Sequence, residues 1–267
     1  MAVFQDQVIV VTGASEGIGR ALCLRLAKER AKLVLAARNE ERLESLRAEL
    51  VDRGVEGLCV PTDVTDQGQC RQLVERTVEH FGRLDVLVNN AGATMWARLD
   101  ELEDPELLER LMRLNYLSSA WCTYYALEHV KRSRGLLVAV ASVSGFSGIP
   151  TRTAYCASKH AMVGFFDALR IELADAGVGV TIVAPDFVLS EAHRRATGPD
   201  GKPLGESPLQ QDQVMTAEEC ADITVRGMAK RKRLVLMTAR SRLGRVMKVF
   251  APSLVDRIAR RAIEQKR

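Results

Sequence analysis

Tyr155 and Lys159 are the two residues whose chemistry and spacing stand out first in this sequence. They lie four positions apart in "YCASK", with only small residues between them. Residues four apart share one face of a helix, so a phenol and an ammonium here point into one cleft. A free tyrosine has a pKa of about 10. A nearby ammonium would stabilise the phenolate and lower that pKa, which would let Tyr155 donate and accept a proton.

Two further polar residues precede this pair. Ser142 ends the apolar run "VAVAS", and Asn115 lies in "LMRLNYLSS". A serine at this place would hydrogen-bond a carbonyl oxygen on which negative charge develops. A strand-end serine or an asparagine on a helix flank is also an ordinary structural residue, so neither decides the function alone.

A glycine-rich turn follows the first apolar run of the chain. The stretch "TGASEGIG" covers residues 12–19 and leads into a helical pattern. Glycines allow a close backbone approach, and a helix N-terminus offers free N–H groups to a phosphate. The residues expected to form this cradle are Gly13, Ser15, Glu16, Gly17, Ile18 and Gly19. A strand, a glycine turn and a helix in this order predict a dinucleotide-binding fold.

Apolar runs alternate with helix-length segments along most of the chain, which is typical of βαβ units. The predicted strands cover 8–12, 32–37, 57–63, 84–92, 136–142, 178–185 and 233–237, and the clearest helices 66–81, 101–131 and 153–175. We therefore expect an α/β fold: a single doubly wound Rossmann-type domain over residues 1–240. It would have about seven parallel strands with helices on both faces. A C-terminal helical extension, residues 241–267, would follow.

The end of the second predicted strand bears on the choice of cofactor. A carboxylate there would hydrogen-bond the ribose 2′-hydroxyl of NAD. The sequence is "LAARNE", so Arg38 stands near that place, and Glu40 and Glu41 fall in the first helical turn. A guanidinium can pair with a 2′-phosphate. The sequence predicts NADP(H) in preference to NAD(H).

The motifs together resemble those of the short-chain dehydrogenase/reductase family over roughly residues 5–240. They are "TGASEGIG", "TDV" at 62–64, "NNAG" at 89–92, the Asn115 segment, Ser142 and "YCASK", in the family's order. The resemblance implies a catalytic tetrad of Asn115, Ser142, Tyr155 and Lys159. Lys159 would also bind the nicotinamide ribose, and Asn115 would hold a water. The further cofactor contacts that it implies are Asp63, Val64, Asn89, Ala91, Gly92, Tyr155 and Lys159.

The sequence departs from the family's pattern after the sixth strand. The family usually has Pro-Gly and then a threonine that contacts the carboxamide. Here the chain reads "APDFVLSEAH": Pro185 is kept, Asp186 replaces the glycine, and Ser190 stands at the threonine. Val188 stays a candidate backbone contact. We expect Asp186 to change the path of this loop.

The segment 190–213 is polar, rich in proline and glycine, and long for a loop, so we expect a substrate lid. Mostly apolar side chains flank the predicted site, and the candidates for substrate binding are Ser142, Trp96, Phe146, Phe187 and Leu189. They favour a fairly apolar, even lipid-like, ketone, aldehyde or alcohol. The same side chains would also suit a protein core, and this alternative stays open.

Composition narrows the class of protein. The chain is 47% apolar, and its longest apolar runs fall far short of the ~20 residues of a membrane span. Its six cysteines form no C-x-x-C pair and its histidines have no metal-ligand spacing, so we expect a cytoplasmic protein without a metal. A homodimer or homotetramer is also expected.

Positive charge gathers at the C-terminus. Residues 230–267 hold 13 Lys/Arg and 2 Asp/Glu, a net +11, which leaves −7 for the rest. Two basic amphipathic helices are predicted here, with Leu243, Val246 and Phe250 on the apolar face of the first. They would pack against a partner subunit or the lid, or lie peripherally on an anionic membrane. Nucleic acid is not an expected partner, because no recognition motif accompanies the charge.

Two functions stay open from the sequence. The intact tetrad favours an enzyme that interconverts a carbonyl and an alcohol. The alternative is a dinucleotide-binding sensor or scaffold that uses the glycine turn without turnover.

Overall fold

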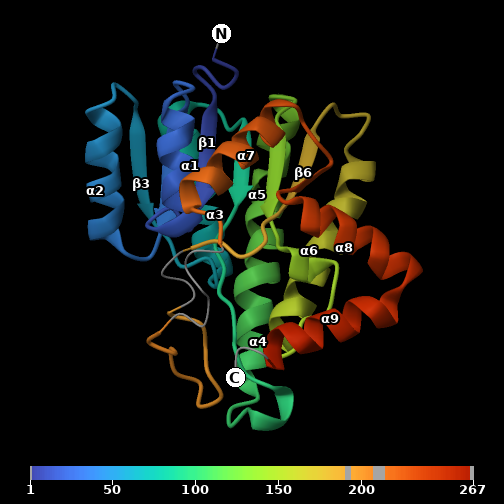
Figure 1. Ribbon diagram of the computed structural model, residues 1–267. Helices are drawn as coiled ribbons and strands as arrows, with labels where there is room; N and C mark the ends of the chain where they lie inside the picture. Colours follow the sequence, from blue (N-terminus) through green and yellow to red (C-terminus); the bar gives the residue numbers. More distant parts are fainter. Residues whose placement is uncertain (1, 190–193, 207–213, 265–267) are drawn as a thin grey trace.

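The computed structural model describes residues 2–189, 194–206 and 214–264, and within them seven parallel strands form one sheet, in the order β3-β2-β1-β4-β5-β6-β7 (Figure 1). The strands are β1 (Val8–Thr12), β2 (Lys32–Ala37), β3 (Gly57–Pro61), β4 (Val86–Asn89), β5 (Leu136–Val140), β6 (Gly179–Ala184) and β7 (Leu234–Leu236). The order reverses between β1 and β4, and open α/β sheets bind ligands at the carboxyl ends of strands beside such a point. The predicted Rossmann-type α/β fold is confirmed.

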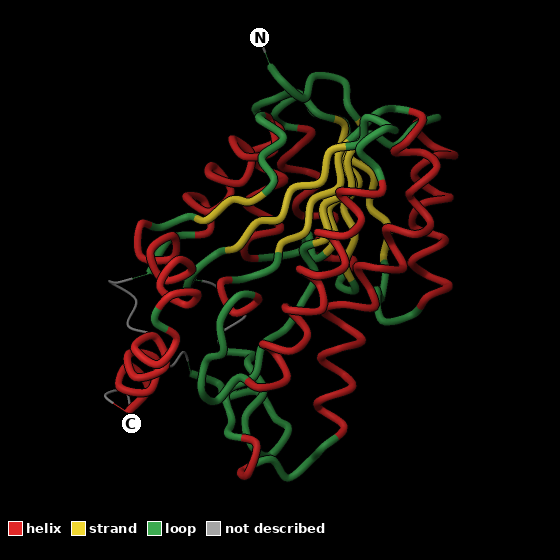
Figure 2. Tube along the Cα trace, turned by 90° about the vertical axis from the view of Figure 1, so that its right-hand side faces the viewer, coloured by secondary structure: helices red, strands yellow, loops and turns green. Residues whose placement is uncertain are grey.

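Helices cover both faces of the twisted sheet (Figures 1 and 2). One face carries α1 (Gly17–Ala27), α2 (Glu40–Val51) and α7 (Ala217–Ala229), and the other α3 (Gln67–Phe81), α5 (Ser118–Arg132) and α6 (Thr153–Glu172). Within β1, Ile9 and Val11 enter the first core, and Val8 and Val10 enter the second. Because both faces are buried, the strands are continuous apolar runs without alternation.

The helical region predicted at 101–131 is divided in the structure. A short 3-10 turn (Leu99–Glu101) precedes α4 (Glu106–Met112), and a π-helical turn (Arg113–Leu117) joins α4 to α5. Pro105 stands where α4 begins, since proline cannot occupy a helix interior without breaking it. The π turn contains Asn115, and such turns are frequent at functional sites.

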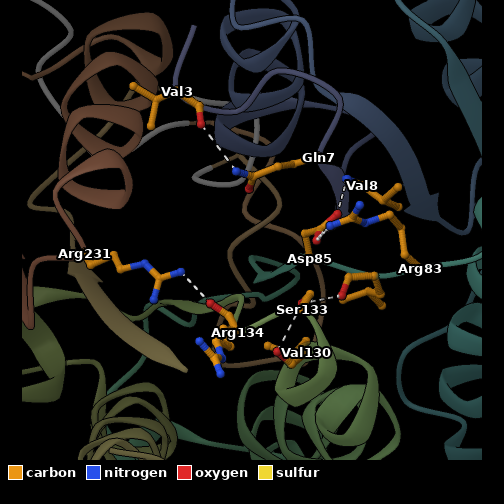
Figure 3. Close-up of polar contacts among 10 residues, drawn as sticks. Val3, Gln7, Val8, Arg83, Asp85, Val130, Ser133, Arg134 and Arg231 are labelled. Atoms are coloured by element: carbon orange, nitrogen blue, oxygen red, sulfur yellow. Dashed lines mark hydrogen bonds and ion pairs between the residues drawn. The ribbon is translucent and has the colours of Figure 1, made fainter. Parts of the chain in front are cut away.

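The amino ends of the strands carry polar groups that bond within the protein (Figure 3). Asp85, which is 4% exposed, accepts from the Val8 N–H at 2.9 Å and from Arg83 Nη2 at 2.6 Å. Arg231 Nη2 donates to the Arg134 carbonyl at 2.6 Å. This edge is closed by internal hydrogen bonds.

Two helices follow β7 in the predicted extension, α8 (Ala239–Phe250) and α9 (Pro252–Glu264) (Figure 1). The apolar side chains of Leu243, Val246 and Phe250 are 60%, 55% and 83% exposed, so the described residues of the chain leave that face uncovered. Among the residues that the structure describes, none of the helices combines the length and the apolarity needed to cross a membrane.

Candidate active site

A cleft of ≈ 930 Å³ lies at the carboxyl ends of the strands. Its walls come from the glycine turn, from the segments that follow β2, β3, β4, β5 and β6, and from the first turns of helix α6. The predicted site residues that line it are Gly13, Ser15, Glu16, Gly17, Ile18, Gly19, Arg38, Asp63, Val64, Ala91, Gly92, Ser142, Tyr155, Lys159, Pro185, Phe187 and Val188. The fold therefore brings most of the candidates into one space.

The glycine turn leaves no room for a side chain at Gly13 or Gly19. A Cβ on Gly13 would lie 2.9 Å from the Ala91 Cα, and one on Gly19 would overlap the Gly13 carbonyl. Gly13 and Gly17 also have φ of +67° and +51°, in the left-handed region that favours glycine. Glu16 stands at the N-cap of α1 without a side-chain capping hydrogen bond, so in the described part of the chain the first N–H groups of this helix stay open to a ligand. This cradle fits the pyrophosphate of a dinucleotide.

Arg38 and Asp63 mark the far end of the cleft, after β2 and β3. Burial acts to raise the pKa of Asp63, but the net shift is downward. Hydrogen bonds from the Thr65 N–H and hydroxyl, at 2.9 and 2.8 Å, lower it, and the charge of Arg38 adds to this. Arg38 itself is exposed, so its guanidinium is accessible to a ligand in the cleft.

Lys159 lies within α6 and is 4% exposed. Its Nζ donates to the Val140 carbonyl at 2.9 Å and lies 5.9 Å from the centroid of the Tyr155 ring. Burial lowers the pKa of this ammonium from 10.5 to about 8. The pair thus shares one helix face at the cleft, as the spacing predicts.

The pKa of Tyr155 moves in the direction opposite to our expectation. Burial raises it above the ordinary value, because the phenolate loses hydration, and a hydrogen bond with Ser142 and the charge of Arg152 only partly offset this. Lys159 donates to a carbonyl instead of to the phenol. Burial therefore favours the protonated phenol of Tyr155 over the phenolate.

Asn115 lies behind the wall of the cleft and is fully buried. Its Oδ1 accepts from the Ala93 N–H at 2.9 Å, and its Nδ2 donates to the Ala93 carbonyl and to Ser158 Oγ at 3.0 and 2.9 Å. A Cβ on Gly92 would lie 2.8 Å from that Oδ1. Asn115 thus holds the segment after β4 against α6.

Asn89 is not part of the cleft wall, because its side chain points into the core. Its Nδ2 donates to Thr123 Oγ1 on α5 at 3.1 Å. The neighbouring Asn90 lines the cleft and donates from Nδ2 to the Thr12 carbonyl at 2.9 Å. Asn90 therefore fixes the glycine turn, and the sequence offered no signal to choose between two adjacent asparagines.

Three of the apolar substrate candidates do not line the cleft. Trp96 lies behind it, with its ring centroid 4.3 Å from Arg152 Cζ. The ring centroid of Phe146 lies 4.8 Å from the Cζ of Arg245 on α8. Leu189 is 38% exposed. Phe187 and Ser142 do line the cleft. Ser190 falls outside the described residues.

Asp186, at the family's glycine position, has a structural role. Its Oδ1 accepts from the Phe187 N–H at 3.1 Å, and its Oδ2 accepts from Thr238 Oγ1 at 3.3 Å. Thr238 caps α8, so the carboxylate joins the loop after β6 to the C-terminal extension. Its φ is not positive, so this backbone does not need glycine.

A family model described as short chain dehydrogenase matches residues 7–199. The chain belongs to this family. It is an oxidoreductase of the short-chain dehydrogenase type.

Curated relatives and solved structures resemble this short-chain dehydrogenase over most of its length. An 11-beta-hydroxysteroid dehydrogenase of Pinus massoniana is 34% identical over 94% of this chain and 72% of that protein. A dehydrogenase/reductase SDR family protein 7-like of Dictyostelium discoideum is 30% identical over 95% of this chain and 80% of that protein. The structure of an alcohol dehydrogenase from Thermococcus sibiricus, complexed with 5-hydroxy-NADP, is 29% identical over 86% of this chain and 94% of that chain, with a TM-score of 0.74. The structure of a short chain dehydrogenase/reductase from Burkholderia phymatum, complexed with NAD, is 26% identical over 95% of this chain and 96% of that chain, with a TM-score of 0.83.

Proposed function

We propose that the protein is an NADP(H)-dependent oxidoreductase that interconverts a ketone or aldehyde and an alcohol. The observation that carries this proposal is the meeting of Tyr155, Lys159 and Ser142 in the same cleft as the glycine cradle. The binding of NADP and NAD compounds by two structures of the same fold supports a nicotinamide dinucleotide. The cradle, with its excluded Cβ positions and open N–H groups, would hold the pyrophosphate.

When bound, the nicotinamide supplies or accepts the hydride. The chain's own residues handle the proton. Tyr155 donates its hydroxyl proton to the carbonyl oxygen in reduction and receives that proton in oxidation. Ser142, which forms a hydrogen bond with Tyr155, donates a hydrogen bond to the same carbonyl oxygen as negative charge grows on that oxygen. The charge of Arg152 lowers the pKa of Tyr155 and so favours the phenolate left after transfer, and Lys159, whose Nζ lies 5.9 Å from the ring centroid, would add to this.

The test is NADPH oxidation with a reactive ketone, comparing wild type with Tyr155→Phe. Loss of the hydroxyl should lower kcat by about a thousandfold, because no proton donor remains, while NADPH affinity changes little. Tyr124→Phe, which alters a tyrosine 72% exposed on α5, is the matched control. NADPH binding without wild-type turnover of any ketone would instead support the sensor or scaffold alternative.

The preference for NADP(H) rests on Arg38. Its exposed guanidinium lines the cleft after β2, and Glu40 and Glu41 are held in the first turn of α2. Arg38→Asp should lower the NADPH/NADH ratio of kcat/KM by at least about tenfold. The control Arg53→Asp changes an exposed arginine outside the cleft and should leave the ratio alone. An unchanged ratio in Arg38→Asp would refute this assignment.

The substrate proposed is a carbonyl compound with an apolar body, because Phe187 and Ile149 line the cleft beside Tyr155. The lid proposal for 190–213 is supported by Arg195 and Pro203, which line the cleft. Arg195 also forms an ion pair with Glu16 of the glycine turn.

We infer that the exposed face of α8 packs against a second subunit, with an anionic membrane as the alternative. Deletion of 241–267 should then shift the oligomeric state in sedimentation without changing flotation with anionic vesicles.

A further inference from the structure

Arg152 is a buried cation in the wall of the active-site cleft. It stands at the N-cap of α6, three residues before Tyr155, and is 4% exposed. Within the described part of the chain, its Nε and Nη2 have no hydrogen-bond partner, and no carboxylate pairs with it. Arginine is almost never buried without such a partner. The exception therefore needs an explanation.

Aromatic rings surround the guanidinium. Its Cζ lies 4.3 Å from the ring centroid of Trp96, 5.1 Å from that of Phe187 and 5.9 Å from that of Tyr155. Rings attract a cation through their faces, but they give its N–H groups only weak acceptors. Burial lowers the pKa of Arg152, which reflects the lost hydration of its charge. Among the described residues, the N–H groups on Nε and Nη2 thus still lack an acceptor.

The acidic residues that share the cleft are engaged elsewhere. Both oxygens of Asp186 accept hydrogen bonds, from the Phe187 N–H and from Thr238. Glu16 forms ion pairs with Arg42 and Arg195. Asp63 accepts from Thr65 at the far end of the cleft. Among the described residues, the acids of the cleft therefore leave Arg152 without a counter-ion.

We propose that Arg152 binds a carboxylate of the substrate, so that the enzyme interconverts an oxo acid and the corresponding hydroxy acid. This inference rests on the function proposed above and names its substrate class. A planar guanidinium matches a carboxylate with two parallel hydrogen bonds, and the flanking rings suit a flat, apolar substrate body.

The position of Arg152 also limits the substrate's shape. Because its Cζ lies 5.9 Å from the Tyr155 ring centroid, only a few bonds separate the acid from the carbonyl that Tyr155 protonates. The carboxylate does not react. The carbonyl carbon gains a hydride from the reduced cofactor, its oxygen gains a proton from Tyr155, and the products are the hydroxy acid and the oxidised cofactor.

The first test compares an aryl oxo acid with its neutral ester. We would measure kcat/KM with NADPH for 3-benzoylpropanoate, its methyl ester and the neutral 1-phenyl-1,2-propanedione. Wild type should prefer the acid over the ester by at least about tenfold. Arg152→Met should lose at least about tenfold more on the acid than on the ester, whose reduction is affected only through the charge that Arg152 places near Tyr155. Arg152→Lys keeps the positive charge but loses the planar guanidinium that can make two parallel hydrogen bonds. Its kcat/KM on the acid should therefore lie between those of wild type and Arg152→Met.

Arg245→Met is the matched control. Arg245 also places its guanidinium over an aromatic ring, at 4.8 Å from Phe146, but it is exposed on α8 and outside the cleft. It should leave the preference for the acid unchanged. Circular dichroism of each variant would show that the fold is kept.

The second test measures binding without turnover. Trp96 stacks on Arg152, and the chain has 2 tryptophans, so Trp121→Phe leaves Trp96 as a single fluorescent probe. Titration of the cofactor complex should show 4-phenylbutanoate binding at least about tenfold more tightly than 4-phenylbutanamide. Adding Arg152→Met should remove this difference.

The outcomes separate this inference from the proposed function. Turnover of the dione, with acid and ester reduced alike, overturns the role of Arg152 and leaves the reductase function standing. No turnover with either nicotinamide cofactor overturns the reductase function, and the fluorescence titration still decides whether Arg152 binds a carboxylate. Equal loss on acid and ester in Arg152→Met shows that Arg152 acts through Tyr155 or through the fold and not on the carboxylate, and it also overturns the inference.

Discussion

The two edges of the sheet treat buried charge in opposite ways. At the amino edge, Asp85 is 4% exposed and accepts hydrogen bonds from a backbone N–H and from Arg83 (Figure 3). At the carboxyl edge, Arg152 is equally buried, but two of its nitrogens have no acceptor among the residues that the structure describes, and Lys159 donates to the neutral Val140 carbonyl. A charge that bonds within the protein supports the fold. A charge kept without a counter-ion is destabilising until a ligand pairs with it.

This contrast follows from the sheet's topology. The carboxyl ends of parallel strands converge on the switch point, where short loops expose backbone to a ligand. Functional sites of this kind are held at some expense of stability, whereas the opposite edge is free to optimise its hydrogen bonds. Removing a charge from the two edges should therefore change stability with opposite sign.

The largest effect is expected at the amino edge. Asp85→Ala should lower the free energy of unfolding by about 3 kcal/mol, because it leaves the Val8 N–H unsatisfied and Arg83 without its partner. Urea denaturation would measure this, and activity per folded molecule should not change. The control Glu75→Ala breaks an exposed pair with Arg71 and should have no measurable effect. A loss as small as the control's would contradict a stabilising role for this edge.

The opposite sign is expected for Lys159→Met, which should stabilise the protein by about 2 kcal/mol at pH 7. The folded pKa of Lys159 is about 8 against 10.5 unfolded. A shift of that size corresponds to a penalty of about 3 kcal/mol, and loss of the bond to the Val140 carbonyl returns about 1 kcal/mol. Catalysis should fall sharply in the same variant.

The pH dependence of the free energy of unfolding checks that the pKa of Lys159 is lowered, and not raised, in the folded protein. Because the folded pKa is the lower one, the unfolded state binds more protons between pH 8 and 10.5. Wild type should therefore gain stability across that window, and the advantage of Lys159→Met should vanish near its upper end. Urea unfolding at three pH values would measure the difference, with the partly exposed Lys131→Met as control. A difference constant with pH would mean that Lys159 is not held with a lowered pKa.

The parts of the fold and of the site that the sequence predicts are those that depend on residues close together in the chain. The parallel strands are visible because residues such as Val10 and Ile9 fill opposite cores of one strand, which leaves no polar alternation. The glycine turn is visible because the Cβ atoms excluded at Gly13 and Gly19 leave glycine as the fitting residue. Tyr155 and Lys159 share a helix face by spacing alone.

What the sequence leaves undetermined depends on contacts between distant segments. Arg152 looks like a surface arginine in "PTRTAY", and it is buried because Trp96 and Phe187 come from two other loops. The same burial raises the pKa of Tyr155, against the expectation from its neighbouring lysine. Asn89 and Asn90 differ in orientation only because β4 ends between them.

The smallest effect, and the most direct test of the comparison, is the stability of Arg152→Met without ligand. Methionine keeps contact with the three rings and removes the buried charge and its unbonded N–H groups. We expect a gain of about 1 kcal/mol, since the removed penalty exceeds the lost cation–π attraction. Saturating cofactor and 3-benzoylpropanoate should then raise the Tm of wild type more than that of the variant, because only wild type pairs with the acid. A variant less stable than wild type would make Arg152 a structural residue like Asp85, and the two edges would no longer differ in kind.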